Sequence, residues 1–172
     1  MAVPALATAR LALRPRSEVD MPAMLAMAGD PEVMRYFRTR PGDDPEAYRA
    51  ALQQRVRHDD GPGLGYWSLF PQADPGRYLG WVSLDPLAET PHIQLGYRLV
   101  RAAWGGGYVT EASRRVLEYG FDALGLGEIV AIVHPDNTRS QAVIRRLGFT
   151  ADGMRLHFGR QRLFYRLVRT PP

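Results

Sequence analysis

Cysteine is absent from the sequence, and its absence removes several kinds of chemistry at once. Without a thiol the chain has no disulfide, no cysteine-ligated zinc or iron–sulfur site and no cysteine nucleophile. The four histidines, His58, His92, His134 and His157, show none of the paired spacings of a helical zinc motif. We therefore expect this protein to bind no metal ion.

Long apolar runs are absent as well. No stretch of about 18 apolar residues is available to cross a membrane, and residues 1–6 lack the charged-then-apolar pattern of a signal peptide. We therefore expect a cytoplasmic protein without a membrane partner. The 172 residues, 45% hydrophobic and 23% charged, suit one compact domain, which we expect to cover residues 1–172.

Lysine is missing too, so arginine supplies all of the permanent positive side-chain charge, and the net charge is +4. The planar guanidinium grips phosphate through two hydrogen bonds, which suits an anionic ligand such as a phosphate-bearing cofactor, an acidic protein or a nucleic acid. Codon bias in a GC-rich genome explains the arginines equally well. We expect no nucleic-acid partner, because no basic and aromatic recognition motif accompanies the pair Arg145 and Arg146.

Helical and strand patterns alternate along the chain. Alternating or continuous apolar stretches indicate strands, and apolar residues three or four apart after a capping residue indicate helices. This mixed order predicts an α/β fold with a single sheet flanked by helices. We expect strands over residues 11–15, 66–70, 78–84, 92–100 and 128–134 and a final pair between 149 and 168, and helices after Asp20, Asp30 and Asp44 and from near Thr110 and Asn137.

Three consecutive glycines, Gly105 to Gly107, lie between an expected strand and an expected helix. Glycine has no Cβ to obstruct a phosphate, and a helix N-terminus offers unpaired N–H groups and the positive end of its dipole, so this turn suits a diphosphate. It is not a P-loop, because no lysine follows, and it is not a dinucleotide fingerprint, because residue 110 is threonine. Taken alone, the glycines are equally consistent with a flexible hinge.

In its context, Trp104 to Ala112, the glycine turn resembles that of the GNAT acetyltransferases, and in particular the RimJ/RimL-like branch that acetylates the N-terminal alanine or serine of ribosomal proteins. Further segments carry the resemblance, which extends from about Leu11 to Arg169: residues 11–15, 30–36, 95–97, 135–140 and 147–149. It implies a mixed, mostly antiparallel sheet of about seven strands, whose strands splay apart where acetyl-CoA binds.

The resemblance also implies a set of acetyl-CoA contacts. The diphosphate would lie on the N–H groups of the glycine turn, the pantetheine arm would pair with the preceding strand, and the thiol would lie near the start of the last helix. In this sequence these positions are Gly105, Gly106, Gly107, Tyr108, Val109 and Thr110 for the diphosphate, Leu99 and Val100 for the arm, and Asn137 and Ser140 near the thiol. Relatives commonly have alanine or glycine where Val109 stands, so its side chain would crowd the loop unless it points into the core, which we favour.

Amide formation from a thioester needs a neutral amine, a polarised carbonyl and a proton for the departing thiolate. The resemblance implies that Ser140 protonates the thiolate or orients the thiol; its other interpretation is a helix cap. Many relatives carry a glutamate that acts on the amine through water, whereas this chain has Gln94 there. His92 is our candidate general base, because the ordinary histidine pKa of about 6.5 suits the task; its other interpretation is a surface or hydrogen-bonded histidine.

The resemblance implies an N-acetyltransferase that transfers the acetyl group of acetyl-CoA directly to a primary amine, preferably the α-amine of a protein N-terminus. Two alternatives stay open: a small-molecule acceptor (amino acid, aminoglycoside or polyamine), and a catalytically silent coenzyme A binding module, which Gln94 would suit. The expected partners are coenzyme A and the amine acceptor, and a homodimer is left open. Because Gln94 replaces the carboxylate, we expect the rate to follow the pKa of the acceptor amine.

Overall fold

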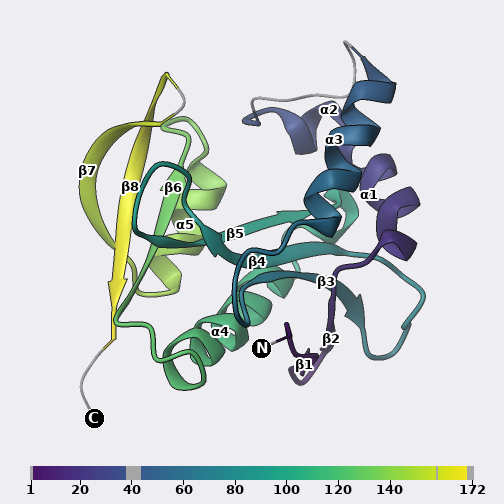
Figure 1. The fold of residues 1–172 in the computed structure, drawn as a ribbon, viewed down its shortest axis with the longest axis horizontal. Coiled ribbons are helices and arrows are strands. Elements are labelled where there is room, and N and C mark those ends of the chain that lie inside the picture. Colours follow the sequence, from purple (N-terminus) through teal and green to yellow (C-terminus); the bar gives the residue numbers. More distant parts are fainter. Residues whose placement is uncertain (1, 38–43, 158, 170–172) are drawn as a thin grey trace.

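The structure is a computed structural model that describes residues 2–37, 44–157 and 159–169. Eight strands form one sheet in the order β1-β2-β3-β4-β5-β6-β8-β7 (Figure 1). The strands are β1 (Leu6–Ala7), β2 (Leu11–Pro15), β3 (Gly65–Pro71), β4 (Gly80–Pro86), β5 (Ile93–Leu99), β6 (Glu128–Val133), β7 (Thr150–His157) and β8 (Arg160–Val168). The predicted α/β fold is confirmed. The additional strand is β1, whose two residues pair with Leu13 and Ala12 and are too few to leave a sequence pattern.

Helices cover both faces of this sheet. They are α1 (Met21–Ala28), α2 (Pro31–Met34), α3 (Pro45–Arg57), α4 (Tyr108–Asp122) and α5 (Thr138–Arg146), with short 3-10 turns η1 (Glu18–Asp20) and η2 (Arg101–Ala103). Two helix starts show why the sequence predicted them: the side chains of Asp30 and Asp44 accept hydrogen bonds from the N–H groups of Glu32 and Ala47, with proline as the first helical residue. No helix in the described part of the chain is long and apolar enough to cross a membrane.

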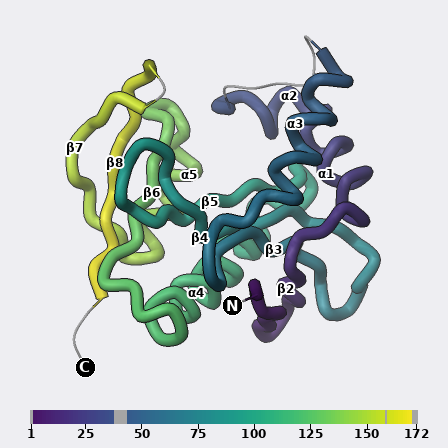
Figure 2. Tube along the Cα trace, viewed as in Figure 1, coloured from purple at the N-terminus to yellow at the C-terminus, as the bar shows by residue number. Residues whose placement is uncertain are grey.

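The main core lies between α4 and the sheet. Val116 of α4 packs with Val82, Leu84 and Ile129, all fully buried, and each buried aliphatic side chain of this kind stabilises the fold by about 1.5–3 kcal/mol. A second core joins α1, α2 and α3 through Met24, Met34 and Leu52, with Tyr78 packed against it. Figure 2 shows α1 to α3 at the side of the molecule away from the β7–β8 hairpin.

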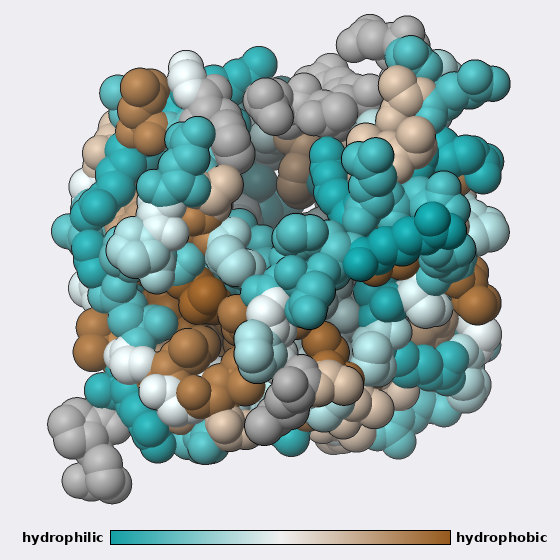
Figure 3. Space-filling model, viewed as in Figure 1, coloured by the Kyte–Doolittle hydropathy of each residue, from teal (hydrophilic) through white to brown (hydrophobic). Residues whose placement is uncertain are grey.

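The sheet is divided between β5 and β6. All other neighbouring strands are antiparallel, whereas β5 and β6 are parallel and pair at one position, Gln94 with Val130. Beyond that pair the two strands diverge, as the resemblance implied. Figure 3 shows the surface hollowed between the α2–α3 side and the β6–β8 side. The split therefore leaves polar backbone of β5 without a strand partner beside this hollow.

Candidate active site

The glycine turn has the backbone that its sequence predicts. Gly105 and Gly107 have φ of 77° and 75°, in the left-handed region that glycine adopts readily. Gly107 immediately precedes α4, so the helix begins at Tyr108, two residues before the predicted start. The first three N–H groups of a helix have no acceptor within it. The N–H groups of Gly105, Gly106 and Gly107 also donate to no backbone carbonyl within the described ranges. Six consecutive donors, from Gly105 to Thr110, are thus available to a ligand.

Arg10, at the end of the β1–β2 turn, holds this glycine turn in place. One of its terminal nitrogens donates to the carbonyl of Gly106 (3.0 Å), and its Nε donates to Glu111 Oε2 (2.6 Å). Glu111 also accepts hydrogen bonds from the Thr8 hydroxyl (2.6 Å) and the Arg10 N–H (3.0 Å). Burial alone would raise the pKa of Glu111, but the hydrogen bonds from Thr8 and Arg10 outweigh it and lower the pKa. We call Thr8, Arg10 and Glu111 the turn clamp. Sequence reasoning missed it, because Glu111 lies 101 residues after Arg10 and 103 after Thr8.

A basic hollow of about 520 Å³ lies beside the glycine turn. Its lining includes Gly107 and Thr110. Four arginines, two of them paired with the two carboxylates of the same hollow, leave it a net positive charge; these residues are Arg10, Arg114, Arg115, Arg146, Glu111 and Glu118. Val109 packs against the main core, so its side chain does not crowd the turn. The positive charge and the free N–H groups therefore meet at one place, which suits a phosphate-bearing ligand.

The predicted arm-binding residues lie at the end of β5. The N–H group of Val100 donates to the Leu79 carbonyl (2.9 Å), and the carbonyl of Leu99 accepts from the Trp104 indole (3.1 Å). These two polar groups are therefore already used within the chain. Any pairing with a pantetheine arm has to use other backbone groups of β5 on the side of the split.

At the part of the site where the thiol is predicted to bind, Ser140 lies beside Tyr97 of β5. The Ser140 hydroxyl oxygen lies 2.8 Å from the Tyr97 hydroxyl, and burial raises the pKa of Tyr97 to about 12. Capping of α5 falls to Asn137, whose side-chain oxygen accepts from the Ser140 N–H (3.1 Å). Asn137 is therefore the N-cap of α5, while the Ser140 hydroxyl lies against Tyr97. Nearby, Tyr36 donates to the Asp136 carbonyl (3.1 Å), so two of the segments that carry the family resemblance meet here.

His92 and Gln94 have different partners. The His92 Nδ1 lies 3.2 Å from Glu128 Oε1, and its ring centroid lies 5.7 Å from that of Phe164, so it is held on the β6–β8 side. Gln94 turns to β4 instead, where its Nε2 donates to Asp85 Oδ2 (3.0 Å). The structure thus pairs Gln94 with a carboxylate that sequence reasoning did not consider.

The sequence matches the family model described as acetyltransferase (GNAT) domain over residues 10–150. The chain belongs to the GNAT acetyltransferase family. The family resemblance is thereby confirmed, and with it an N-acetyltransferase in place of a protein of some other class. No metal-binding cluster of three or more His, Asp or Glu side chains is found among the described residues of this GNAT chain.

Relatives extend the match over the whole domain. The FsC-acetyl coenzyme A-N(2)-transacetylase of Aspergillus fumigatus is 31% identical over 158 residues, covering 87% of this chain and 66% of its own length. An acetyltransferase structure from Agrobacterium tumefaciens superposes with a TM-score of 0.82 at 27% identity, covering 98% of this chain and 96% of that one. RimL, a ribosomal L7/L12 α-N-protein acetyltransferase solved with coenzyme A, superposes with a TM-score of 0.77 at 20% identity, covering 96% and 98%. At that identity RimL shares the fold.

In this GNAT domain the unexpected carboxylate is Asp85, near the end of β4. It is 7% exposed, and its Oδ1 accepts from the Ser83 hydroxyl (2.7 Å) while its Oδ2 accepts from Gln94. Burial raises the pKa of Asp85, and the hydrogen bonds from Ser83 and Gln94 oppose the rise only in part. The signal in the sequence was the alternation of Ser83 and Asp85 with Val82 and Leu84, which places both polar side chains on the face away from the main core.

Proposed function

We propose that this GNAT enzyme binds acetyl-CoA with its diphosphate on the N–H groups of Gly105, Gly106, Gly107, Tyr108 and Val109. The observation that carries this proposal is the run of free donors ahead of α4. An added Cβ at Gly105 would meet no atom within 4 Å, so the space above the turn is open to a ligand. The turn clamp and the surrounding arginines support the assignment, because they orient the turn and add positive charge beside it.

We further infer that the acetyl group passes directly to a primary amine, the bound thioester supplying the acetyl group and a thiolate leaving group. Leu99 and Val100 border the arm, and Asn137 and Ser140 border the sulfur. Since burial keeps Tyr97 protonated at neutral pH, its hydroxyl can hydrogen-bond to Ser140 while the Ser140 hydroxyl donates to the sulfur. Ser140 is therefore the proposed proton donor, and Tyr97 its positioning residue.

We propose the α-amine of a protein N-terminus as the preferred acceptor. With an ordinary pKa of about 7.7–8.0, roughly 10–15% of such an amine is neutral at pH 7, against about 0.04% for a lysine side chain with a pKa of about 10.4. RimL, named for an α-amine of a ribosomal protein, supports this choice. The fungal relative, named for a nitrogen of FsC, favours a small-molecule amine as the second candidate.

A panel of N-terminal peptides and small amines, assayed with acetyl-CoA by the release of thiol, tests the proposal. We expect peptides with a free N-terminus to be acetylated and the same peptides with a blocked N-terminus to be inert. Acetylation of small amines alone would establish the second candidate. Binding of acetyl-CoA without transfer to any amine would show a coenzyme A binding module and end the proposal of catalysis.

A further inference from the structure

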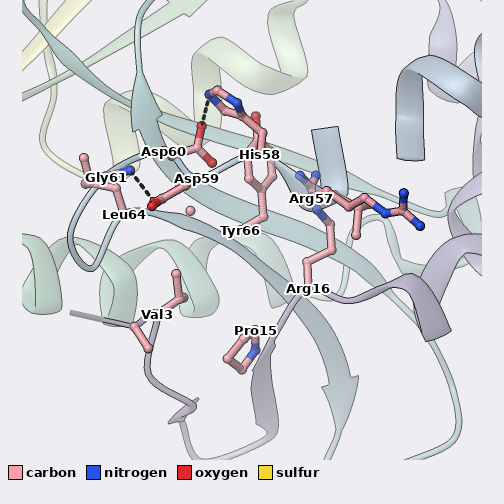
Figure 4. A pocket seen from close by; sticks show the side chains of 13 residues that line it. Val3, Pro15, Arg16, Arg57, His58, Asp59, Asp60, Gly61, Leu64 and Tyr66 are labelled. Atoms are coloured by element: carbon pink, nitrogen blue, oxygen red, sulfur yellow. Dashed lines mark hydrogen bonds and ion pairs between the residues drawn. The ribbon is translucent and has the colours of Figure 1, made fainter. Parts of the chain in front are cut away.

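The acceptor amine has to lose a proton, and Gln94 cannot take it. A carboxylate is nevertheless present one strand away, because the register pairs Asp85 of β4 with Gln94 of β5. We propose that Asp85 is the general base of this enzyme, and that the proton leaves through the pocket drawn in Figure 4. The proposal rests on the proposed function, since it concerns the amine of the same transfer.

The position of Asp85 relative to the sheet supports this role. Ser83 pairs with Gly96 in the register, and an ideal Cβ on Gly96 would lie 2.6 Å from the Ser83 hydroxyl oxygen and 3.7 Å from Asp85 Oδ1. The Asp85 carboxylate therefore lies beside the Gly96 backbone together with Ser83 and Trp81, on the face of β5 that carries Gln94 and opposite to the Tyr97 side chain. The carboxylate is 7% exposed and is hydrogen-bonded to Gln94, the position at which many relatives carry a glutamate. Its two oxygens accept from Ser83, Gln94 and Tyr66, and a carboxylate has about four lone-pair sites, so it can accept one more hydrogen bond.

A polar path leads from Asp85 to solvent. Tyr66 of β3 hydrogen-bonds toward Asp85, and Asp60 contributes to the electrostatic field at both groups. Tyr66 and Asp60 line a pocket of about 450 Å³ together with His58, whose Nε2 lies 3.8 Å from Asp60 Oδ1. Figure 4 shows the Tyr66 side chain directed toward Asp60 and His58. The proposed route for a proton on Asp85 therefore runs through the Tyr66 hydroxyl toward Asp60 and His58, which line the pocket.

The surroundings of Asp85 favour its protonated form. Burial raises the pKa of Asp85 and of Asp60; the charge of Asp60 raises the pKa of Asp85 further, and the charge of Asp59 does the same for Asp60. The opposing charge is Arg16, the residue after β2, whose guanidinium lies 3.6 Å from the centre of the Tyr66 ring, and Arg55 of α3 also acts on Tyr66. A general base is most effective when its pKa approaches the working pH, so a desolvated aspartate is better suited than an exposed one.

The acetyl transfer moves two protons from the nitrogen and one to the sulfur. The acceptor arrives as an ammonium, and one N–H proton moves to an Asp85 oxygen, which frees the nitrogen electron pair. That pair forms the C–N bond at the thioester carbon, and the C–S bond breaks with its electron pair on sulfur. The second proton of the nitrogen passes to Ser140, which gives its own hydroxyl proton to the sulfur. The products are the amide, the free thiol and one proton, which Asp85 releases through the pocket.

The pH dependence of kcat/KM in the unaltered enzyme gives the first test. If Asp85 takes the proton from an ammonium, the rate rises with the ionisation of Asp85, and the midpoint is the same for acceptors of different amine pKa. Without such a base the midpoint shifts with the pKa of the acceptor amine, which is the behaviour expected if Gln94 is the only side chain at this position. A midpoint that follows the acceptor amine would overturn the proposal. Absence of transfer to every amine would instead refute the proposed function, so the two failures are distinct.

Matched variants give the second test. Asp85→Asn keeps the shape and can still bond to Ser83 and Gln94; we expect kcat/KM at pH 7 to fall at least about 100-fold, with acetyl-CoA affinity unchanged. This decrease in kcat/KM should become smaller when the pH exceeds the pKa of the acceptor amine, because the amine is then already neutral when it binds. Adding Gln94→Glu to Asp85→Asn returns a carboxylate to the same pair and should recover at least about tenfold. A loss that is equal at every pH, or that Gln94→Glu does not relieve, would show that Asp85 is structural.

Discussion

Replacing Gly107 by alanine should weaken acetyl-CoA binding, and the structure gives both the cause and a control. An alanine Cβ at Gly107 would meet only Arg10 Nη2, at 3.5 Å, so there is no clash to relieve. The cost is conformational: φ is 75°, and a non-glycine residue in the left-handed region loses about 1–2 kcal/mol. If the turn relaxes to avoid this strain, the donors before α4 move. Loss of about 1.4 kcal/mol corresponds to a tenfold increase in Kd.

Gly125 is the matched control, because its φ is 68° and an added Cβ there also meets nothing within 4 Å. Both Gly107→Ala and Gly125→Ala should lower the thermal unfolding midpoint by about 2–8 °C, as 1–2 kcal/mol does in a protein of this size. Calorimetric titration with acetyl-CoA should show at least a tenfold loss of affinity in Gly107→Ala and none in Gly125→Ala. Equal affinities in the two variants would refute the assignment of the diphosphate to this turn.

Three further substitutions test neighbouring groups. Ser140→Ala should slow transfer by about ten- to a hundredfold at unchanged acetyl-CoA affinity, because a thiolate is a tolerable leaving group without its proton donor; unchanged turnover would contradict the donor role. His92→Ala should alter kcat by less than about threefold, since His92 is paired with Glu128. A decrease in kcat as large as that expected for removal of a general base would contradict this. Glu111→Gln should destabilise the fold at pH 7. The folded pKa of Glu111 lies below the ordinary 4.5, so its contribution is present above that value and lost as the pH falls through the folded pKa; denaturant titrations of both proteins should therefore converge in acid.

Local chemistry explains what the sequence predicted well. A helix start such as Asp44–Pro45 depends on a side chain and a backbone N–H three residues apart, so it can be read directly. The glycine turn is equally local, and its left-handed residues follow from the residue type.

Contacts that depend on strand register could not be predicted in the same way. Gln94 meets Asp85 because β4 and β5 are aligned at that pair, and a shift of one residue would turn Gln94 to the other face. Arg10 reaches Gly106 only because the β1–β2 turn lies beside the start of α4. The sequence showed the residue types at these positions, whereas their partners depend on how distant segments pack.

The division of the sheet at Gln94 and Val130 has a mechanical consequence. Backbone hydrogen bonds barely join the two halves, so the joint is made by α4, which packs on β1, β2, β4 and β5 of one half and on β6 of the other. Helix α4 therefore connects the two halves of the sheet, and its first turn is the proposed binding site for the phosphates of the co-substrate. A ligand bound between β5 and β6 would contact both halves of the sheet. At a concentration a hundredfold above its Kd, it would raise the free energy of unfolding by about 2.7 kcal/mol. The two halves of the sheet are then less firmly joined in the ligand-free protein. In that state, amide protons of β6 and β8 would exchange with solvent faster than those of β3 and β4, and ligand binding would reduce the difference.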